Sequence, residues 1–355
     1  MPAERDQQPL VAVVTGVYNG QPYLPQTLAC VQAQTYPNLV HVVLDNASTD
    51  ETPDAIARVA GGRVPILTRR NPSLLTQIAN WNAAFAIVPT GARYVKLLAA
   101  DDLMRADCIE RLVAVAEANP DVGCVTAIDV FEDRVKPHGL DPARTVFDGR
   151  EIARRLLQRD LHWMPFHQAF FRTTANCHTY LFNPEVVPGF DRDLIMGLLL
   201  NGKMGLVNEP LFYTRYHESN VTSALVADGA LLCERLAELQ RVGRELMTTE
   251  EVELQLRAEL RIVLRHILLQ RASRQPALAV KTLQRLADLG VRPGMLDYVA
   301  SVLTWPAYLA RKKMREAAYR AVTPPIRVTE AEFLNLPVSS DHSRRDGPSH
   351  PASQA

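Results

Sequence analysis

The sequence predicts an α/β fold, with a mostly parallel sheet flanked by helices and a helical region at the C-terminal end. Over residues 10–118, short apolar runs rich in β-branched residues alternate with stretches of helical periodicity. Such alternation is typical of parallel sheets that helices cover on both faces. Leucines at helical spacing then dominate residues 226–320. A length of 355 residues is enough for one large domain or two smaller ones.

The strands and helices follow one another in a regular order. Residues 10–14 are apolar and are followed by Gly16 and Asn19-Gly20, so we expect a buried strand there. The further expected elements are strands at 39–44, 64–67 and 94–98, and helices at 24–34, 51–60, 76–88 and 105–118. Ligands of such sheets bind outside the carboxyl ends of the strands, so residues that follow each strand are candidates for a functional site.

Charge and cysteine content exclude several classes of protein. The 39 basic and 39 acidic side chains cancel, so no basic surplus is present to bind the phosphates of a nucleic acid. Five cysteines without C-x-x-C spacing are typical of a reducing compartment, not of a disulfide framework or a zinc ribbon. The N-terminus does not read as a signal peptide, and no run of about 18 apolar residues occurs. We therefore expect a cytoplasmic protein without a nucleic-acid partner.

Acidic side chains follow two of the expected strands. Asp45 and Asn46 end the second strand, and Asp101 and Asp102 follow the fourth. At the carboxyl ends of parallel strands these side chains share one crevice, where adjacent carboxylates repel unless a divalent cation binds. The pattern therefore indicates a Mg²⁺ or Mn²⁺ site able to bridge the phosphates of a nucleotide. The alternative is that Asp101 and Asp102 only cap the helix that follows.

Several motifs occur in a fixed order along the first two thirds of the chain. They are the strand leading to Val17-Tyr18-Asn19, the helix ending Gln34-Thr35-Tyr36-Pro37, the turn DNASTD at 45–50, Asn80-Trp81-Asn82, and YVKLLAADDL at 94–103. In this order they resemble family 2 glycosyltransferases, inverting GT-A enzymes that use nucleotide-sugar donors, over roughly residues 10–222. The resemblance implies a GT-A-like catalytic domain at 1–224. A helical region at 225–322 and an extended or disordered tail at 323–355 are expected after it.

The resemblance also implies a donor site and a metal site. The residues expected around the nucleotide are Thr15, Val17, Tyr18, Asn19, Asp45, Asn46, Asn82 and Asp101. Asp101 and Asp102 correspond to the family's carboxylates at the divalent metal (Mn or Mg). His217 is similar to a late histidine near the metal or the diphosphate, and imidazole suits Mn²⁺-like ions. Ala99 and Ala100 stand where many members of the family carry a further acidic or polar residue.

An inverting transfer requires a general base that takes the proton from the acceptor hydroxyl. Residues 188–200, PGFDRDLIMGLLL, resemble the family's helix that begins with this base. The resemblance implies Asp191 as the base, with Phe190 where a Glu is usual, and Asp193 in the same turn as the alternative. Both carboxylates would otherwise only complement the helix dipole.

Four further features of the sequence, His217, Arg215, an aromatic patch and a basic helix, each have more than one interpretation. His217 either lies near the metal or the diphosphate or is a surface residue after an edge strand, and Arg215 either faces the diphosphate or points outward along the strand. The patch around His162, Trp163 and His167 either binds the acceptor or belongs to the core. Trp305 and Tyr308 beside the basic run at 311–315 are typical of a helix on an anionic membrane surface, at the inner face of the membrane. The alternatives there are a basic face packed on the catalytic domain and a homodimer contact.

These observations predict an enzyme that moves a sugar from a nucleotide-diphosphate sugar to a hydroxyl acceptor. The family implies cell-surface polysaccharide or glycolipid synthesis, with a lipid-linked or polysaccharide acceptor. The alternative is a catalytically weakened nucleotide-sugar-binding or scaffolding protein, motivated by Ala99 and Ala100. A nucleotidyltransferase is disfavoured, because residues 15–23 contain no Lys or Arg to hold a triphosphate.

Overall fold

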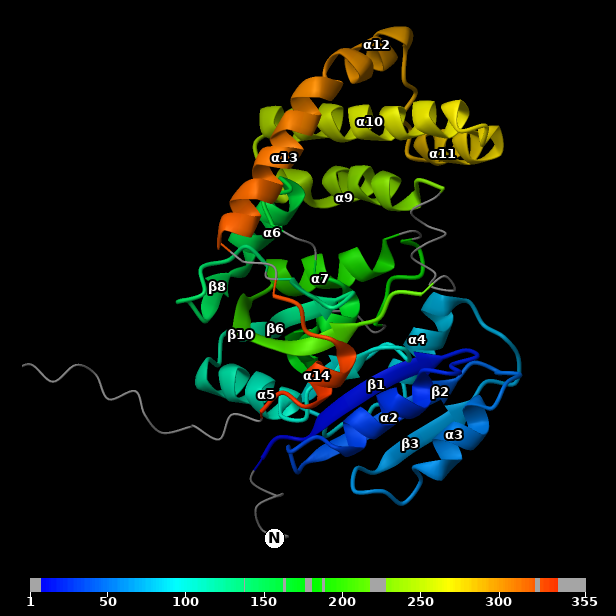
Figure 1. Cartoon of the computed structure of the whole chain (residues 1–355), viewed down its shortest axis with the longest axis vertical. Helices are drawn as coiled ribbons and strands as arrows, with labels where there is room; N and C mark the ends of the chain where they lie inside the picture. The colour runs from blue at the N-terminus through cyan, green and yellow to red at the C-terminus, as the bar shows by residue number, and fades with distance from the viewer. Residues whose placement is uncertain are drawn as a thin grey trace, which may run out of the picture.

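The chain folds around one large sheet, with a stack of helices beyond it (Figure 1). The computed structural model describes residues 8–136, 138–161, 164–175, 181–186, 189–217, 228–322 and 326–337. In the view of Figure 1, the first strands lie at one end of the long axis and the C-terminal helices at the other. None of the described helices is both long enough and apolar enough to cross a bilayer.

The first half of the sheet is parallel. Its strands are β1 (Val11–Val17), β2 (Leu39–Asp45), β3 (Ile66–Arg70) and β4 (Tyr94–Leu97). β1 pairs in parallel with both β2 and β4, and β2 pairs in parallel with β3. The register sets Val17 beside Asp45, so the carboxyl ends of β1 and β2 open at one edge. The four strands expected from the sequence are confirmed, with ends that differ by a few residues.

The second half of the sheet is mixed, so the expectation of a mostly parallel sheet holds for the first half only. Its strands are β5 (Leu103–Met104), β6 (Val122–Phe131), β7 (Arg134–Lys136), β8 (Val146–Asp148), β9 (Phe170–Arg172) and β10 (Lys203–Thr214). The order is β3-β2-β1-β4-β9-β6-β10-β5, with β7 on β6 and β8 on β10. β9 runs antiparallel to β4 and β6, whereas β10 is parallel to β6. The short strand β9 therefore joins the two halves.

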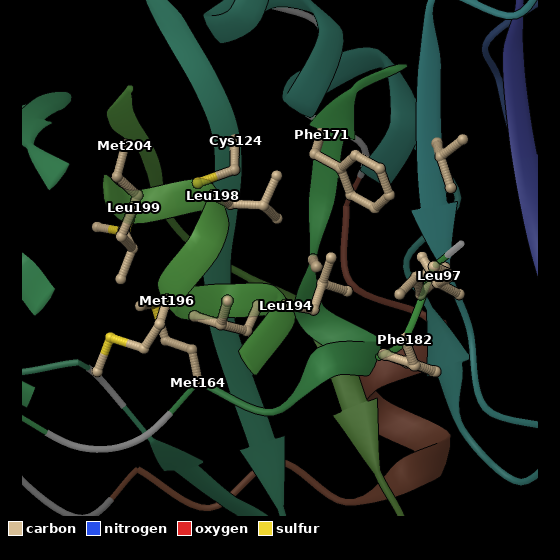
Figure 2. Close-up of a cluster of buried hydrophobic side chains, with 14 of the residues drawn as sticks. Leu97, Cys124, Met164, Phe171, Phe182, Leu194, Met196, Leu198, Leu199 and Met204 are labelled. Atoms are coloured by element: carbon tan, nitrogen blue, oxygen red, sulfur yellow. The ribbon is translucent and has the colours of Figure 1, made fainter. Parts of the chain in front are cut away.

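Helices cover both faces of the sheet. One face carries α4 (Gln77–Phe85), α6 (Gly149–Leu157) and α7 (Phe190–Leu200), and the other carries α2 (Leu24–Gln32), α3 (Thr52–Arg58) and α5 (Cys108–Ala118). Short 3₁₀ turns, η1 (Phe166–Gln168) and η2 (Thr173–Ala175), flank β9. Figure 2 shows Leu194 and Leu198 of α7 in one cluster with Cys124 of β6, Phe171 of β9 and Leu97 of β4. This core extends across both halves and fixes α7 on the sheet.

The C-terminal region is helical, as the leucine spacing predicts. Its helices are α9 (Ala230–Leu246), α10 (Thr249–Ala272), α11 (Pro276–Asp288), α12 (Met295–Leu303) and α13 (Trp305–Val322). Pro276 begins α11 and Gly290 follows it with a φ of 73°. α9 packs on α6, and α10 packs on α9, so the stack continues outward from the sheet (Figure 1). The boundary expected at 224–225 lies outside the described residues.

The expectation of an extended or disordered tail at 323–355 is wrong for part of that range, which contains a short helix. Thr329 caps a short helix, α14 (Glu330–Leu334), and forms a reciprocal capping box with Glu332. Phe333 is fully buried, with its ring centroid 5.5 Å from that of Tyr213 in β10. The segment is ordered because the capping box starts a helix and one aromatic side chain anchors it to the sheet. Residues 338–355 lie outside the described residues.

Candidate active site

The loops that follow β1 and β2 are tied together by short polar side chains. The amide nitrogen of Asn19 donates to Ser48 Oγ (2.9 Å), and Asn19 Oδ1 accepts from the amide of Thr49 (2.8 Å). Asp45 is buried, accepts from the amide of Ser48 at 2.9 Å, and lies 3.4 Å from Arg70 Nε. These contacts hold both loops in one arrangement at the edge where a ligand of a parallel sheet is expected.

The residues expected around the nucleotide do not all face this edge. Tyr18 and Asn19 are exposed there, with Tyr18 at 47%. Thr15 and Val17 are buried within β1, and Thr15 Oγ1 lies 3.0 Å from His41 Nε2. Within the segment 15–19 that is expected to line the base and ribose, the side chains of Thr15 and Val17 therefore point into the packed layers. A contact of these two residues with the nucleotide stays a prediction, and it would have to come from their backbone.

Two of the expected residues, Asn46 and Asn82, use their amides to hold backbone. Asn46 Nδ2 donates to Leu75 O, and Asn46 Oδ1 accepts from Leu75 N, each at 2.9 Å. Asn82 makes the same reciprocal pair with the backbone of Phe182, at 2.8 and 2.7 Å. Such paired bonds are typical of positioning roles. Asn46 therefore fixes the loop before α4, and Asn82 fixes the segment that leads to α7.

Asp101 and Asp102 lie after β4, where two histidines approach them. Asp101 Oδ2 is 3.0 Å from His217 Nε2, and the His217 ring stacks on Tyr23 with centroids 4.5 Å apart. Asp102 is buried, accepts from the amide of Arg215 at 3.1 Å, and has His167 Nδ1 at 3.6 Å from its Oδ2. Burial, together with the charge of Asp101, raises the pKa of Asp102 well above its usual range. Of the three residues expected at the metal, Asp101 and His217 are in contact, whereas the carboxylate of Asp102 faces Arg215 and His167.

This arrangement fits a cation that shares its coordination with a substrate. Within the described ranges, no group of three or more His, Cys, Asp or Glu side chains is placed to hold a metal ion. Mg²⁺ in nucleotide sites binds through one or two carboxylates together with phosphate oxygens. Asp101 with His217 provides that number of protein ligands. A cage built only from protein side chains does not fit the residues described.

A buried polar cluster lies next to Asp102, and of its members only His167 is a residue that the sequence singles out. His167 Nε2 is 2.9 Å from Thr214 Oγ1, and Thr214 Oγ1 donates to Asp129 Oδ1 at 3.0 Å. Burial raises the pKa of Asp129 to about 7, and burial, followed by the charge of Lys96, lowers the pKa of His167 to about 3. His167 is therefore a neutral imidazole at physiological pH. The sequence does contain a pattern that indicates Asp129, because it is the one carboxylate in the otherwise apolar run at 122–131.

Lys96 lies beneath this cluster, in the centre of the sheet. Its Nζ donates to Leu97 O at 2.7 Å and also to His167 O, and it is 4.3 Å from the ring centre of Phe212. Burial lowers the pKa of Lys96 to about 8. An ammonium among buried carboxylates offsets part of their mutual repulsion. A lysine in the middle of the apolar run 94–98 is again a signal that sequence reasoning missed.

Helix α7 carries Asp191 in its first turn, next to Arg192 and near Glu234 and Glu238 of α9. Burial raises the pKa of Asp191. Asp193 lies 3.7 Å from Arg241 of α9 in an ion pair. Of the two carboxylates considered as a base, Asp191 is therefore the one with the raised pKa, and Asp193 is the one paired with Arg241.

The helical region holds the first turn of α7 through α9. Arg192 makes a buried ion pair with Glu238. Arg192 Nη2 lies 2.5 Å and Arg192 Nε lies 3.0 Å from Glu238 Oε2. Glu234 faces Gly189, and burial, with Asp191 as the next cause, raises the pKa of Glu234 to about 8. Residues 234, 238 and 241 follow helical spacing and lie on one face of α9. This face therefore sets where α7 begins.

Arg215 does not point outward along β10, one of its two expected orientations. Its guanidinium donates to Asp101 O at 2.8 Å and to both carboxylate oxygens of Glu330 in α14, at 2.9 and 2.5 Å. It also lies over the Tyr23 ring at 5.3 Å. Arg215 therefore connects the Asp101 loop to the C-terminal tail. Of the patch considered for the acceptor, His167 belongs to the polar cluster, whereas His162 and Trp163 lie outside the described residues.

Sequence comparisons relate the chain to glycosyltransferases. Residues 12–178 match the model of the family described as Glycosyl transferase family 2. An uncharacterized glycosyltransferase of Nostoc sp., alr2836, is 26% identical over 218 residues, which are 59% of this chain and 66% of that protein. Glycosyltransferase GlyG of Streptococcus pneumoniae is 30% identical over 117 residues, 32% of this chain and 37% of GlyG. The chain spans less than two thirds of these curated relatives.

Solved structures show the same fold at low sequence identity. S. aureus TarS 1-349, crystallised with UDP-GlcNAc, has a TM-score of 0.54 and 14% identity, covering 80% of this chain and 93% of TarS 1-349. Mannosyltransferase PcManGT from Pyrobaculum calidifontis, crystallised with GDP-Man and Mn²⁺, has a TM-score of 0.52 and 19% identity, covering 87% and 83%. The predicted GT-A-like fold is thereby confirmed, and residues 12–178 are similar to family 2 glycosyltransferases.

Proposed function

We propose that the chain is an inverting glycosyltransferase that moves a sugar from a nucleotide-diphosphate sugar to a hydroxyl acceptor. The observation that carries the proposal is the acidic pair after β4, with Asp101 beside His217 and Asp102 beside His167, next to the loops after β1 and β2. Asp101, Asp102 and His167 lie within residues 12–178, which match the model described as Glycosyl transferase family 2, and His217 lies beyond them. The UDP-GlcNAc and GDP-Man bound to the two structural neighbours support a donor of this class.

The donor is proposed to bind along the edge formed by β1, β2 and β4. Tyr18 and Asn19 are exposed there and Asp45 forms its floor, so they would contact the base and ribose. Asp101 and His217 would hold a Mn²⁺ or Mg²⁺ ion, with Asp102 as the adjacent carboxylate. When bound, such an ion neutralises charge that develops on the departing diphosphate.

Asp191 is the proposed general base. The acceptor oxygen attacks the anomeric carbon, the bond from that carbon to the diphosphate oxygen breaks, and the hydroxyl proton moves to Asp191. Attack opposite to the leaving group inverts the anomeric centre. The raised pKa of Asp191 supports the assignment, because a carboxylate with a higher pKa accepts a proton more readily. Asp193 is the alternative, and its pairing with Arg241 makes it the less available of the two.

The setting of the reaction rests on the resemblance and is proposed with it. Cell-surface polysaccharide or glycolipid synthesis would provide a polysaccharide or lipid-linked acceptor. The four described cysteines, Cys30, Cys108, Cys124 and Cys233, are free and buried, which suits the cytoplasm. A peripheral contact with the membrane or a homodimer through the C-terminal helices belongs to the same proposal.

A second candidate is a protein of this fold that binds nucleotide sugars without efficient transfer. Ala99 and Ala100 precede the acidic pair. In the part of the chain that the structure describes, no three ligating side chains gather at one point. These two observations favour weak metal retention.

Calorimetry and a transfer assay distinguish the candidates. The full chain is titrated with UDP- and GDP-sugars with and without Mn²⁺, and donor turnover is then measured with hydroxyl acceptors. Metal-dependent binding with turnover, both lost in Asp101→Ala, is the expected result. Binding without turnover across the panel would support the second candidate. Absence of any nucleotide binding would overturn both.

A further inference from the structure

Helix α12 presents an apolar face at the far end of the molecule. Met295, Leu296 and Leu303 are 81%, 82% and 74% exposed, and Val299 and Val302 are half exposed. These positions recur at i, i+1, i+4, i+7 and i+8, which is one face of a helix. In Figure 1, α12 lies at the end of the long axis away from β1–β4. Scattered exposed apolar residues are ordinary, but a continuous face of this kind marks an interaction surface.

The opposite side of α12 is firmly attached to α10. Arg265 of α10 is buried and donates to Ser301 O and Thr304 Oγ1, each at 2.8 Å. Its guanidinium also lies 4.7 Å from the ring centre of Tyr308, in α13. Ser301 is fully buried at this contact. The corner between α12 and α13 is therefore fixed, and its apolar face is directed outward by packing on the other side.

Basic residues precede and follow this apolar face in the sequence. Between residues 292 and 314 the basic side chains are Arg292, Arg311, Lys312 and Lys313, and the one acidic side chain is Asp297, so the segment carries four minus one, or three, net positive charges. Asp297 accepts from the amide of Gly294 at 2.8 Å, at the start of α12. Leu309 and Met314 extend the exposed apolar surface into α13. The chain as a whole has zero net charge, so this concentration is local.

We propose that residues 292–314, the tip surface, bind to an anionic lipid surface. The apolar face of α12 would enter the boundary between headgroups and acyl chains, and Arg311 and Lys313 would contact acidic headgroups. This inference specifies the membrane contact included in the proposed function, and its test does not require transferase activity.

Two other occupants fit the tip surface less well. In an isologous dimer the same patch faces itself, which brings two clusters with three net positive charges together. The chain's own C-terminal residues 338–355 contain no Leu, Ile, Met, Phe, Trp or Tyr with which to cover the face. An acidic lipid surface complements both the apolar face and the charge.

Vesicle sedimentation of the full chain tests the proposal. Vesicles of phosphatidylcholine with phosphatidylglycerol are compared with vesicles of phosphatidylcholine alone. We expect binding to the anionic vesicles that weakens with salt. Arg311→Ala with Lys313→Ala should weaken it about fivefold for each side chain removed. Leu296→Ser with Leu303→Ser should weaken it by roughly tenfold or more.

Matched controls come from elsewhere in the chain. Leu254→Ser changes an apolar residue of α10 that is 66% exposed, and Arg58→Ala with Arg69→Ala removes two exposed charges from the far end of the molecule. Both should bind vesicles like the wild type, and circular dichroism checks that every variant folds. The proposal is overturned if the wild type does not bind anionic vesicles, or if the controls and tip variants lose binding equally. If the wild type instead forms a dimer and does not bind vesicles, and the double variant Leu296→Ser, Leu303→Ser is monomeric, the tip surface would be assigned to contact with a second copy.

Discussion

Polar side chains at the carboxyl ends of β1 and β2, here called the β1–β2 edge, are held differently from those at the carboxyl ends of β6 and β10, here called the β6–β10 edge. At the first, hydrogen bonds between amides, hydroxyls and backbone join the loops, and Asn46 and Asn19 are typical. At the second, ionisable groups are buried together, with Asp129 and His167 carrying shifted pKa values. Neutral bonds give a shape that does not depend on pH, whereas buried charges give chemistry that does. The proposed donor site is thus on an edge held mainly by neutral bonds, and a cluster of buried titratable groups lies next to it.

The largest effect should come from the proposed base, Asp191. Asp191→Asn keeps the shape of the side chain but cannot take a proton, so kcat should fall by a factor of about 10²–10⁴. Donor affinity should stay unchanged, because Asp191 is proposed to contact the acceptor hydroxyl and not the donor. Steady-state kinetics and calorimetry measure the two quantities. Asp193→Asn is the matched control, and a large loss of kcat there with an active Asp191→Asn enzyme would move the assignment to Asp193.

The next largest effect should be on stability, at the contact between α7 and α9. Glu238→Ala leaves Arg192 buried without its carboxylate, which should lower the free energy of unfolding by about 3–5 kcal/mol. Chemical denaturation measures it. Glu253→Ala, which removes an exposed partner of Arg257 in α10, should cost under about 1 kcal/mol. Equal costs for the two would mean that α9 does not hold the first turn of α7.

A smaller effect is expected at the β1–β2 edge. Asn46→Ala leaves both the N–H and the C=O of Leu75 without partners, so we expect a loss of about 1–3 kcal/mol in stability. Donor affinity should fall as well, since the loop before α4 is no longer fixed. Denaturation and donor titration measure these changes. Asn38→Ala, which removes one exposed bond to Gln8 O, is the control and should change neither. Unchanged donor binding in Asn46→Ala would show that this loop is not part of the donor site.

The sequence predicts a feature of these two edges where a short run of neighbouring residues carries its pattern, and not where the feature depends on residues far apart in the chain. The first four strands are predicted because each is a short apolar run bounded by turn residues. The same argument gives Asp45, Asp101 and Asp102, which follow strand ends. The three residues of β9 are too few to show a period, and the Arg192–Glu238 pair joins positions 46 residues apart, so no local pattern marks either.

Some functional side chains were missed although a local signal was present. Lys96 and Asp129 are single charges within apolar strands, where an ionisable residue must be paired or neutralised. The capping box of Thr329 and Glu332 likewise marks α14 in the sequence. Conversely, Thr15 was assigned to the site by its position after the first run, but β1 continues to Val17 and buries it. The end of a strand is the least certain feature of such a pattern. Residues assigned to the site because they follow a predicted strand end are therefore misplaced by the same number of residues.

The last prediction separates the two edges by pH alone, and its effect on stability is small over any single pH unit. Asp129 has a pKa of about 7 in the folded chain and an ordinary value of 3.8, so between these pH values the folded state binds more protons than the unfolded state. Stability should therefore fall as pH rises from about 4 to about 7, by at most about 1.4 kcal/mol per pH unit from this group. Asp129→Asn mimics the protonated carboxyl and should flatten the profile over that range.

Denaturation at a series of pH values measures this slope. Glu132→Gln is the control, because Glu132 is exposed three residues later in the chain and should leave the slope unchanged. Asn46→Ala adds a second comparison: it should lower the whole profile without changing its slope, because the bonds it removes are neutral. If Asp129→Asn keeps the wild-type slope, Asp129 is ionised in the folded chain. The β6–β10 edge would then be held by fixed charges, and the contrast with the β1–β2 edge would concern charge and not titration.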